Sequence, residues 1–170
     1  MDELERLAAY EAIRQLASHY AVLMDSRDLD ALVELFVDDV RVGRDVRGRA
    51  ALRESFDGTL RGIGVSILNV GTHAITLVDD DHATGVVYCK GEIQDGDRWI
   101  HQAIVYTDTY ERRDGRWLFV RRIHELFYGA EAPLNPMALP PADWPAHHDG
   151  RGTLPERWES WQRFHRESGA

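Results

Sequence analysis

Apolar residues recur every three or four positions along the first part of the chain. Between residues 4 and 24 this spacing predicts one long amphipathic helix. The pattern breaks at Asp25, and Asp28 is placed to cap a second, shorter helix over residues 29–36. Further apolar residues at helical spacing indicate a third helix over residues 49–60. The N-terminal part of the chain therefore predicts three helices.

The apolar spacing then changes to every second residue. Runs of this kind, rich in β-branched and aromatic residues, predict four strands over residues 65–78, 83–93, 99–112 and 117–128. Two of the short connections are Asp95-Gly96 and Asp114-Gly115, a residue pair typical of tight hairpin turns. Strands joined in this way are antiparallel neighbours. We therefore predict an α+β fold in which three N-terminal helices pack on a strongly curved antiparallel sheet, with a concave mouth suited to a small molecule.

The composition changes after Gly129, because all six prolines of the chain lie between residues 133 and 155. Proline-rich sequence of this kind favours an extended, wrapping segment. A last short helical stretch follows over residues 158–164. The sequence thus predicts one domain over residues 1–130 and a proline-rich C-terminal extension over residues 131–170.

The charge and the cysteine content narrow the class of protein. The chain has 170 residues, a formal net charge of −9 and a single cysteine, Cys89. The acidic excess argues against a nucleic-acid partner and against an anionic membrane surface. One cysteine excludes an intramolecular disulfide and a cysteine-based zinc site. The first residues do not resemble a signal peptide, and no apolar run reaches the ~18 residues of a membrane span. We expect a cytoplasmic protein with no nucleic-acid or membrane partner.

Two titratable residues are candidates for chemistry. Asp25 follows an apolar run at the end of the first predicted helix, so its carboxylate lies at the edge of the core and needs a partner. His73 lies in the first predicted strand, and alternation places it on the same face as Asn69 and Gly71. If Asp25 reaches the His73 ring, the pair fixes the tautomer and makes the histidine a general base. The alternative is a solvated helix-end acid and an unrelated core histidine.

The last predicted strand places an arginine on an apolar face. Alternation puts Arg122 and His124 on one side with Leu118 and Val120. A guanidinium in such a position needs a carboxylate or an anion. Arg122 therefore indicates either a buried salt bridge, for which Asp25 is a candidate partner, or a contact to substrate.

The three strand histidines, His73, His101 and His124, are candidates to converge on one pocket. No His-x-His or His-Glu-x-x-His pattern places two metal ligands together, so we predict no metal site. The sequence also lacks a nucleotide-binding glycine loop and a Gly-x-Ser-x-Gly nucleophile turn, and no cofactor is expected.

Three segments of the chain resemble one known family. They are residues 12–25, the tripeptide Gly71-Thr72-His73, and residues 106–117 with the pattern aromatic-x-Asp-x-Tyr-x-x-x-Asp-Gly-x-Trp. Over residues 3–128 the chain resembles the SnoaL-like and scytalone dehydratase-like branch of the nuclear-transport-factor-2-like superfamily. The resemblance implies a cone-shaped α+β barrel and a homo-oligomer, with a trimer favoured over a dimer. It also implies that the C-terminal extension covers the pocket or the subunit interface.

The resemblance carries an expectation about chemistry. Scytalone dehydratase and the hexachlorocyclohexane dehydrochlorinase of this branch use an Asp–His pair, which the resemblance places at Asp25 and His73. It implies a cofactor-independent lyase of the dehydratase type, in which His73 removes a proton from carbon. Tyr20, His101 and Arg122 are then candidates to assist the leaving group, and Arg122 is alternatively placed to stabilise a developing oxyanion.

The substrate is expected to be a small cyclic or polycyclic hydrophobic molecule. The predicted substrate-binding residues are His101, His124, Phe56, Val105, Leu126 and Tyr128. The same base would also serve an isomerase or cyclase of polyketide-like or steroid-like molecules. The fold further hosts non-catalytic ligand-binding modules, so the fold alone does not decide the reaction.

Overall fold

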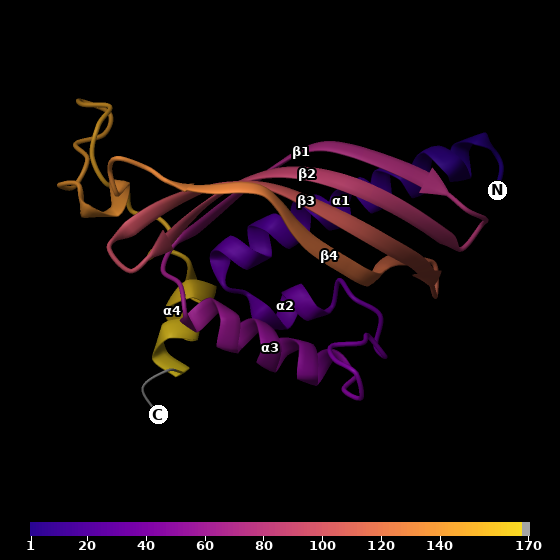
Figure 1. The fold of residues 1–170 in the computed structure, drawn as a ribbon. Coiled ribbons are helices and arrows are strands. Elements are labelled where there is room, and N and C mark those ends of the chain that lie inside the picture. The colour runs from indigo at the N-terminus through magenta and orange to yellow at the C-terminus, as the bar shows by residue number, and fades with distance from the viewer. Residues whose placement is uncertain (168–170) are drawn as a thin grey trace.

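The computed structural model describes residues 1–167, and its helices and strands follow the predicted order. Three helices come first: α1 (Glu3–Ser26), α2 (Leu29–Val33) and α3 (Arg49–Arg61). Four strands follow: β1 (Ser66–Leu77), β2 (His82–Asp95), β3 (Arg98–Arg113) and β4 (Arg116–Glu131). The strands form one antiparallel sheet in the order β1-β2-β3-β4, and Figure 1 shows α1 along one face of this curved sheet with α2 and α3 beneath it. The predicted α+β fold is confirmed.

Local chemistry explains where the elements begin and end. The side chain of Asp2 accepts a hydrogen bond from the backbone nitrogen of Glu5, and the Glu5 carboxylate accepts one from the backbone nitrogen of Asp2. This reciprocal pair starts α1. The predicted hairpin turns carry the left-handed backbone that glycine adopts without strain, with φ of 63° at Gly96 and 77° at Gly115. These two turns keep β2, β3 and β4 adjacent.

A β-bulge in β1 changes which side chains face the helices. Val70 pairs with Cys89 and His73 pairs with Val87, so two residues of β1 lie opposite one residue of β2. Strict alternation predicted that His73 shares a face with Asn69, and this was wrong. Because the extra residue shifts the period of the side chains, half-buried His73 lies on the same inner face as half-buried Val70.

A second bulge, in β4, corrects the predicted neighbours of Arg122. Two adjacent residues of β3 pair with Phe119 and Arg121, so one residue of β4 is left over between them. Alternation predicted Leu118 and Val120 on the face of Arg122. The extra residue instead places the buried ring of Phe119 beside the guanidinium, 4.3 Å from its central carbon.

Aromatic rings fill much of the space between α1 and the sheet. Tyr20, on α1, lies edge-on to four rings, with centroid distances of 5.8 to 6.4 Å to Phe36, Phe56, Tyr106 and Phe119. Each such contact contributes about 0.5–1.5 kcal/mol beyond simple burial. The rings therefore form an apolar wall between α1 and the sheet. A polar side chain that points from the sheet toward α1 is enclosed by this wall.

The C-terminal extension returns to the corner where α1 ends. Its last helix, α4 (Glu159–Arg166), is the predicted C-terminal helix, and Figure 1 shows it in yellow next to α3. The Ser160 hydroxyl donates to the carbonyl oxygen of Ser26 at 2.8 Å. The Trp161 ring lies 4.9 Å from the guanidinium carbon of Arg27. The helix thus covers the end of α1, whereas a role for the extension at a pocket or an interface stays a prediction.

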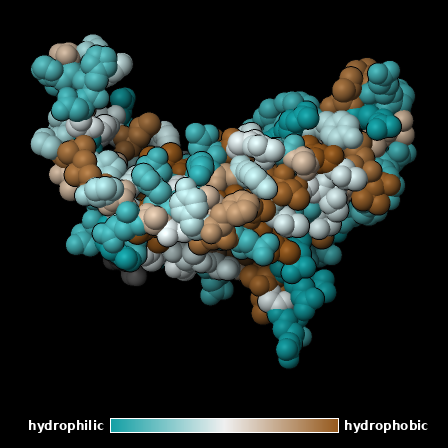
Figure 2. All heavy atoms as spheres, turned by 45° about the horizontal axis from the view of Figure 1, so that its top comes forward, coloured by the Kyte–Doolittle hydropathy of each residue, from teal (hydrophilic) through white to brown (hydrophobic). Residues whose placement is uncertain are grey.

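The rest of the extension and the outer face of the sheet leave apolar groups exposed. Between β4 and α4 the chain forms a 3-10 helix, η1 (Pro136–Ala138), in an arm beyond the end of the sheet (Figure 1). Apolar side chains gather on the molecular surface shown in Figure 2. The large apolar residues of the strands that are exposed by 40–64% include Ile67, Val86, Tyr88 and Phe127. The homo-oligomer remains a prediction.

Within residues 1–167, no helix has the length and apolar character needed to cross a membrane.

Candidate functional site

A buried ion pair joins the two last strands inside the curved sheet. Asp108 of β3 lies directly opposite Arg122 of β4, and the guanidinium binds the carboxylate with two hydrogen bonds. Nε donates to Oδ1 at 2.8 Å and Nη2 donates to Oδ2 at 2.6 Å. The side chains are only 4% and 0% exposed. Burial opposes the charge of Arg122, but the hydrogen bonds to Asp108 outweigh it and raise the pKa of the guanidinium. The predicted buried salt bridge therefore exists, with Asp108 rather than Asp25 as its partner.

Aromatic rings surround the remaining surface of the Arg122 guanidinium. Its central carbon lies 4.3 to 4.4 Å from the ring centres of Tyr20, Tyr106 and Phe119. Cation–π contacts of this kind stabilise a charge that is removed from water. One nitrogen, Nη1, is buried and has no hydrogen-bond partner in the part of the chain that the structure describes. A buried donor without a partner is costly, so this nitrogen is the one unsatisfied group of the ion pair in the described residues.

A tyrosine links this ion pair to His73. The Tyr110 hydroxyl donates to Asp108 Oδ2 at 2.8 Å, and it lies 3.0 Å from Nε2 of His73. Because the tyrosine gives its only proton to the carboxylate, its oxygen accepts from His73. The His73 proton is then on Nε2, and Nδ1 keeps its lone pair. His73, Tyr110, Asp108 and Arg122 form one connected series, which we call the polar chain.

The environment of the polar chain keeps its histidine neutral. Burial lowers the pKa of His73 below its ordinary value of 6.5, and the charges of Arg122 and Arg14 act in the same direction against the opposing charge of Asp108. Burial also raises the pKa of Tyr110, so the phenol stays protonated. At neutral pH the polar chain therefore presents an unprotonated imidazole nitrogen on His73, which is the form required of a general base.

Asp25 belongs to a separate cluster at the end of α1. Its Oδ1 accepts from the Ser66 hydroxyl at 2.9 Å, and its Oδ2 accepts from the backbone nitrogen of Leu68 at 2.8 Å. The Arg27 guanidinium also donates to Ser66, at 2.9 Å. Burial raises the pKa of Asp25 from 3.8 to about 6, despite these hydrogen bonds and the charge of Arg27. Asp25 is thus a carboxyl group held by the first residues of β1.

The structure does not bring Asp25 and His73 into hydrogen-bond contact. Asp25 binds Ser66 and Leu68, whereas Nε2 of His73 binds Tyr110. At a strand rise of 3.2–3.4 Å per residue, the five steps from Leu68 to His73 span at most roughly 16–17 Å. The end of α1 therefore lies beside the start of β1, well short of His73. Sequence spacing alone did not reveal this separation.

The burial of Asp25 predicts a pH effect on stability. A carboxyl group with a raised pKa binds its proton more tightly in the folded state than in the unfolded state, so stability is lost as the pH rises through about 4 to 6. For a partly exposed group we expect a loss of about 2 kcal/mol at most across this interval. The variant Asp25→Asn does not titrate and should lack this loss. Urea unfolding at pH 4.5 and 7.5 measures it, and an equal pH dependence in both proteins would contradict the raised pKa.

Three of the predicted substrate-binding residues lie on the inner side of the sheet. Phe56 of α3 packs 6.3 Å from the Tyr20 ring. The His124 ring lies 5.4 Å from that of Tyr106. Leu126 pairs with buried Ile104, and cross-strand partners share a face. Tyr20, predicted as catalytic, contacts the Arg122 guanidinium through its ring face.

The other three predicted substrate-binding residues lie elsewhere. The Tyr128 hydroxyl accepts a hydrogen bond from the exposed Lys90 ammonium at 3.1 Å. Val105 pairs with Tyr88, which is 47% exposed on the outer face. His101 is exposed, with Nε2 3.8 Å from a Glu92 carboxylate oxygen. His73, His101 and His124 therefore do not converge. Within residues 1–167, no three histidine, cysteine or acidic side chains gather as metal ligands.

Sequence reasoning missed Asp108 and Tyr110. Both lie in the segment of residues 106–117 that was interpreted as a mark of the fold. Their signal was available, because Tyr106, Asp108 and Tyr110 alternate on one face of β3 and all three are buried. A carboxylate between two buried tyrosines requires a cation nearby. The position of Arg122 on the next strand met that requirement.

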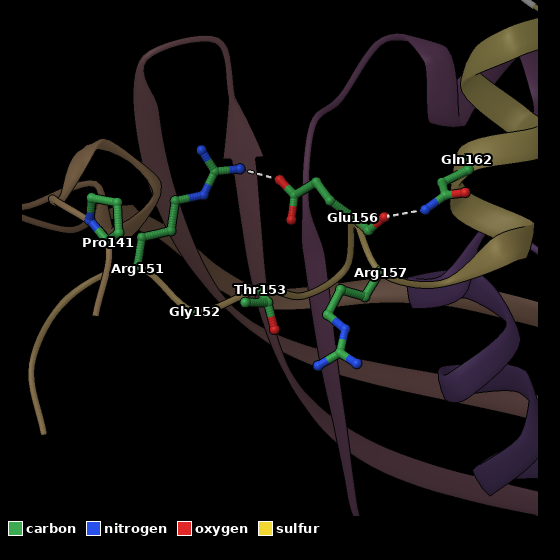
Figure 3. A pocket seen from close by; sticks show the side chains of 7 residues that line it. All are labelled: Pro141, Arg151, Gly152, Thr153, Glu156, Arg157 and Gln162. Atoms are coloured by element: carbon green, nitrogen blue, oxygen red, sulfur yellow. Dashed lines mark hydrogen bonds and ion pairs between the residues drawn. The ribbon is translucent and has the colours of Figure 1, made fainter. Parts of the chain in front are cut away.

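A surface hollow of about 460 Å³ lies in the C-terminal extension, away from the polar chain (Figure 3). Its lining comprises Pro141, Arg151, Gly152, Thr153, Glu156, Arg157 and Gln162. Arg151 forms an ion pair with Glu156, whose carbonyl oxygen accepts from the Gln162 amide at 2.9 Å. The hollow contains none of the predicted site residues. Of the predicted catalytic residues, His73 and Arg122 belong instead to the polar chain inside the sheet.

Comparisons with known proteins give this geometry a context. A family model described as a SnoaL-like domain matches residues 5–123. A γ-hexachlorocyclohexane dehydrochlorinase of Sphingobium indicum is 30% identical over 130 residues, which covers 72% of this chain and 83% of that protein. A solved structure of a type 2 hexachlorocyclohexane dehydrochlorinase has a TM-score of 0.67 and 27% identity, covering 77% of this chain and 93% of that chain. A candidate scytalone dehydratase of Novosphingobium aromaticivorans shares the fold, with a TM-score of 0.66, 19% identity, and coverage of 77% and 92%.

Proposed function

The chain belongs to the SnoaL-like domain family, and from this premise and the polar chain we propose that it is a lyase acting on a small hydrophobic molecule. The reaction is a β-elimination, in which a carbon–hydrogen bond and a carbon–heteroatom bond on the neighbouring carbon both break and a double bond forms. The similarity to dehydrochlorinases supports this reaction class. The observation that carries the proposal is the set of contacts by which Asp108 connects His73, through Tyr110, to Arg122 with its unpaired nitrogen Nη1.

The polar chain supplies the groups that an elimination needs. Nδ1 of His73 takes the proton from carbon, while Nε2–H stays hydrogen-bonded to Tyr110 and, through it, to Asp108. The negative carboxylate stabilises the imidazolium that forms. Nη1 of Arg122 donates to the departing halide or hydroxyl oxygen. The proton taken by His73 then leaves with the halide as hydrogen halide or joins the departing hydroxide as water. The products are the alkene and hydrogen halide or water, so atoms and charge balance without a cofactor.

The direct Asp25–His73 pair has no place in this mechanism. His73 is oriented by Tyr110 and Asp108, and Asp25 is held by Ser66 and Leu68. The rings of Tyr20, Tyr106 and Phe119 around the guanidinium favour a substrate with an apolar ring. The substrate class proposed is therefore a cyclic molecule carrying a halogen or hydroxyl group next to an acidic C–H bond.

A substrate panel tests the proposed reaction. Cyclic β-halo and β-hydroxy ketones and γ-hexachlorocyclohexane are incubated with the full chain, and halide release and product mass are recorded. We expect products lighter by one hydrogen halide or one water. The variant His82→Asn is the control, because His82 is exposed and pairs with Asp79 at the surface. A product of unchanged mass would favour the isomerase or cyclase. Binding without turnover across the panel would favour a ligand-binding module.

A further inference from the structure

The hydrogen bond between His73 and Tyr110 has to cross a strand. His73 lies on β1 and Tyr110 on β3, with β2 between them in the sheet. Neighbouring strands are about 4.8 Å apart, so a tyrosine on β3 reaches β1 only if its ring lies flat over the middle strand. The observed 3.0 Å between the hydroxyl and Nε2 shows that the ring does so.

Strand β2 makes room for this ring with a glycine. Gly85 is buried on the inner face and pairs with Ile75 on β1 and Asp108 on β3. A Cβ atom at position 85 would lie 3.0 Å from both Cε2 and Oη of Tyr110, and 3.2 Å from the carbonyl oxygen of Ala74. Non-bonded carbon atoms prefer about 3.5–4.0 Å, so a methyl group here displaces the tyrosine. The Ala74 oxygen is backbone and yields little.

We propose that Gly85 is a positioning residue for His73, a role that rests on the proposed function of the polar chain. The missing side chain lets Tyr110 bridge Asp108 and His73, which fixes the proton of His73 on Nε2. Gly85 has no side chain to offer to a substrate, and its partner on β1 is Ile75 and not His73. It acts through the place of the Tyr110 hydroxyl.

The substitution Gly85→Ala should therefore disturb the histidine more than the fold. Displacing Oη lengthens and weakens the hydrogen bond to Nε2, so the preference of His73 for the Nε2–H tautomer falls. We expect kcat to fall about 10- to 100-fold with KM little changed, because small misplacements of a catalytic group cost rate rather than binding. In a Tyr110→Phe background, which already lacks the hydroxyl, the same substitution should cost little further activity.

A second glycine of β2 provides the matched control. Gly91 is also buried on the inner face, and a Cβ there would lie 2.9 Å from Cδ1 of Ile104. That atom is the end of a flexible apolar side chain, which can rotate away. Gly91→Ala thus adds the same methyl group to the same strand without touching the polar chain.

The deciding measurement is the nitrogen NMR spectrum of the His73 ring, which needs no turnover. We expect one dominant Nε2–H tautomer in the parent and in Gly91→Ala, and a mixture in Gly85→Ala and Tyr110→Phe. A parent-like His73 spectrum in Gly85→Ala would overturn the inference. If the substrate panel fails but the spectra change as expected, the positioning stands and only the proposed reaction falls.

If Gly85→Ala does not fold, a double variant shows which contact is responsible. The double variant Gly85→Ala/Tyr110→Ala removes the ring that the new methyl group meets. If this protein folds and shows the His73 spectrum of Tyr110→Ala alone, the contact with Tyr110 is the cause. If it also fails to fold, the clash is with the Ala74 backbone and the inference is wrong.

Discussion

Replacing Asp108 with leucine is expected to lower the free energy of unfolding by about 3–5 kcal/mol, the typical effect of removing one partner of a buried ion pair. The reason is the burial of the charge that remains. Arg122 is 4% exposed at its side chain and loses two charge-assisted hydrogen bonds, and Tyr110 loses its acceptor. The three rings around the guanidinium compensate by only about 2 kcal/mol. Urea unfolding followed by tryptophan fluorescence measures the change.

Two further variants separate charge burial from loss of a contact. Asp108→Leu/Arg122→Met replaces the pair by apolar side chains of similar size, and most of the stability should return because no charge is left without a partner. Arg112→Met is the surface control. Its ion pair with Asp81 has a similar distance, 2.9 Å, but the side chains are 32% and 56% exposed. Exposed pairs contribute about 0–1 kcal/mol, so this change should be small. Equal effects of Asp108→Leu and Arg112→Met would contradict the role of burial.

The elements of the fold could be predicted because their signals are local. The spacing of apolar residues marked α1, and Asp-Gly pairs marked both hairpins that carry the central strands. These features depend on residues within a few positions of one another. The order of the sheet then follows from short connections alone. The same locality explains why the last helix, α4, was also predicted.

The faces of the strands could not be predicted, because a bulge has little local signal. One extra residue after Val70 and another beside Phe119 reversed the expected neighbours of His73 and Arg122. Alternation did place Arg122 toward the core. It did not reveal the neighbouring ring, which depends on how β4 pairs with β3.

The partners within the site depend on register between distant segments. The residues left an Asp25–His73 pair as a hypothesis, and the family resemblance assigned the pair to these two positions. In the structure His73 instead forms a hydrogen bond with Tyr110, which lies 37 positions later in the chain. Which residues meet across three strands is set by the pairing of every residue along them. The roles of these residues in catalysis remain predictions of the proposed function.

Replacing His73 with glutamine is expected to lower kcat/KM by about 10²- to 10⁴-fold, the usual contribution of a general base. A glutamine amide nitrogen can still donate to the Tyr110 oxygen, so the polar chain and the fold should be kept. It cannot take a proton from carbon. His82→Asn, at an exposed histidine, should leave the rate unchanged. Halide release or product mass with the best substrate of the panel measures the effect.

The pH profiles of the parent and of Asp25→Asn, compared with each other, identify which group acts as the base. Because burial lowers the pKa of His73, kcat/KM of the parent should rise with pH through a value below 6.5 and then stay level. Acid removes activity by protonating Nδ1. A carboxylate base at Asp25, with its pKa of about 6, would give a rise in the same direction, so the profile of the parent is not decisive. In Asp25→Asn the rise should persist if His73 is the base. Loss of this pH dependence in Asp25→Asn, together with full activity in His73→Gln, would assign the base to Asp25. That result would contradict the mechanism proposed for the polar chain.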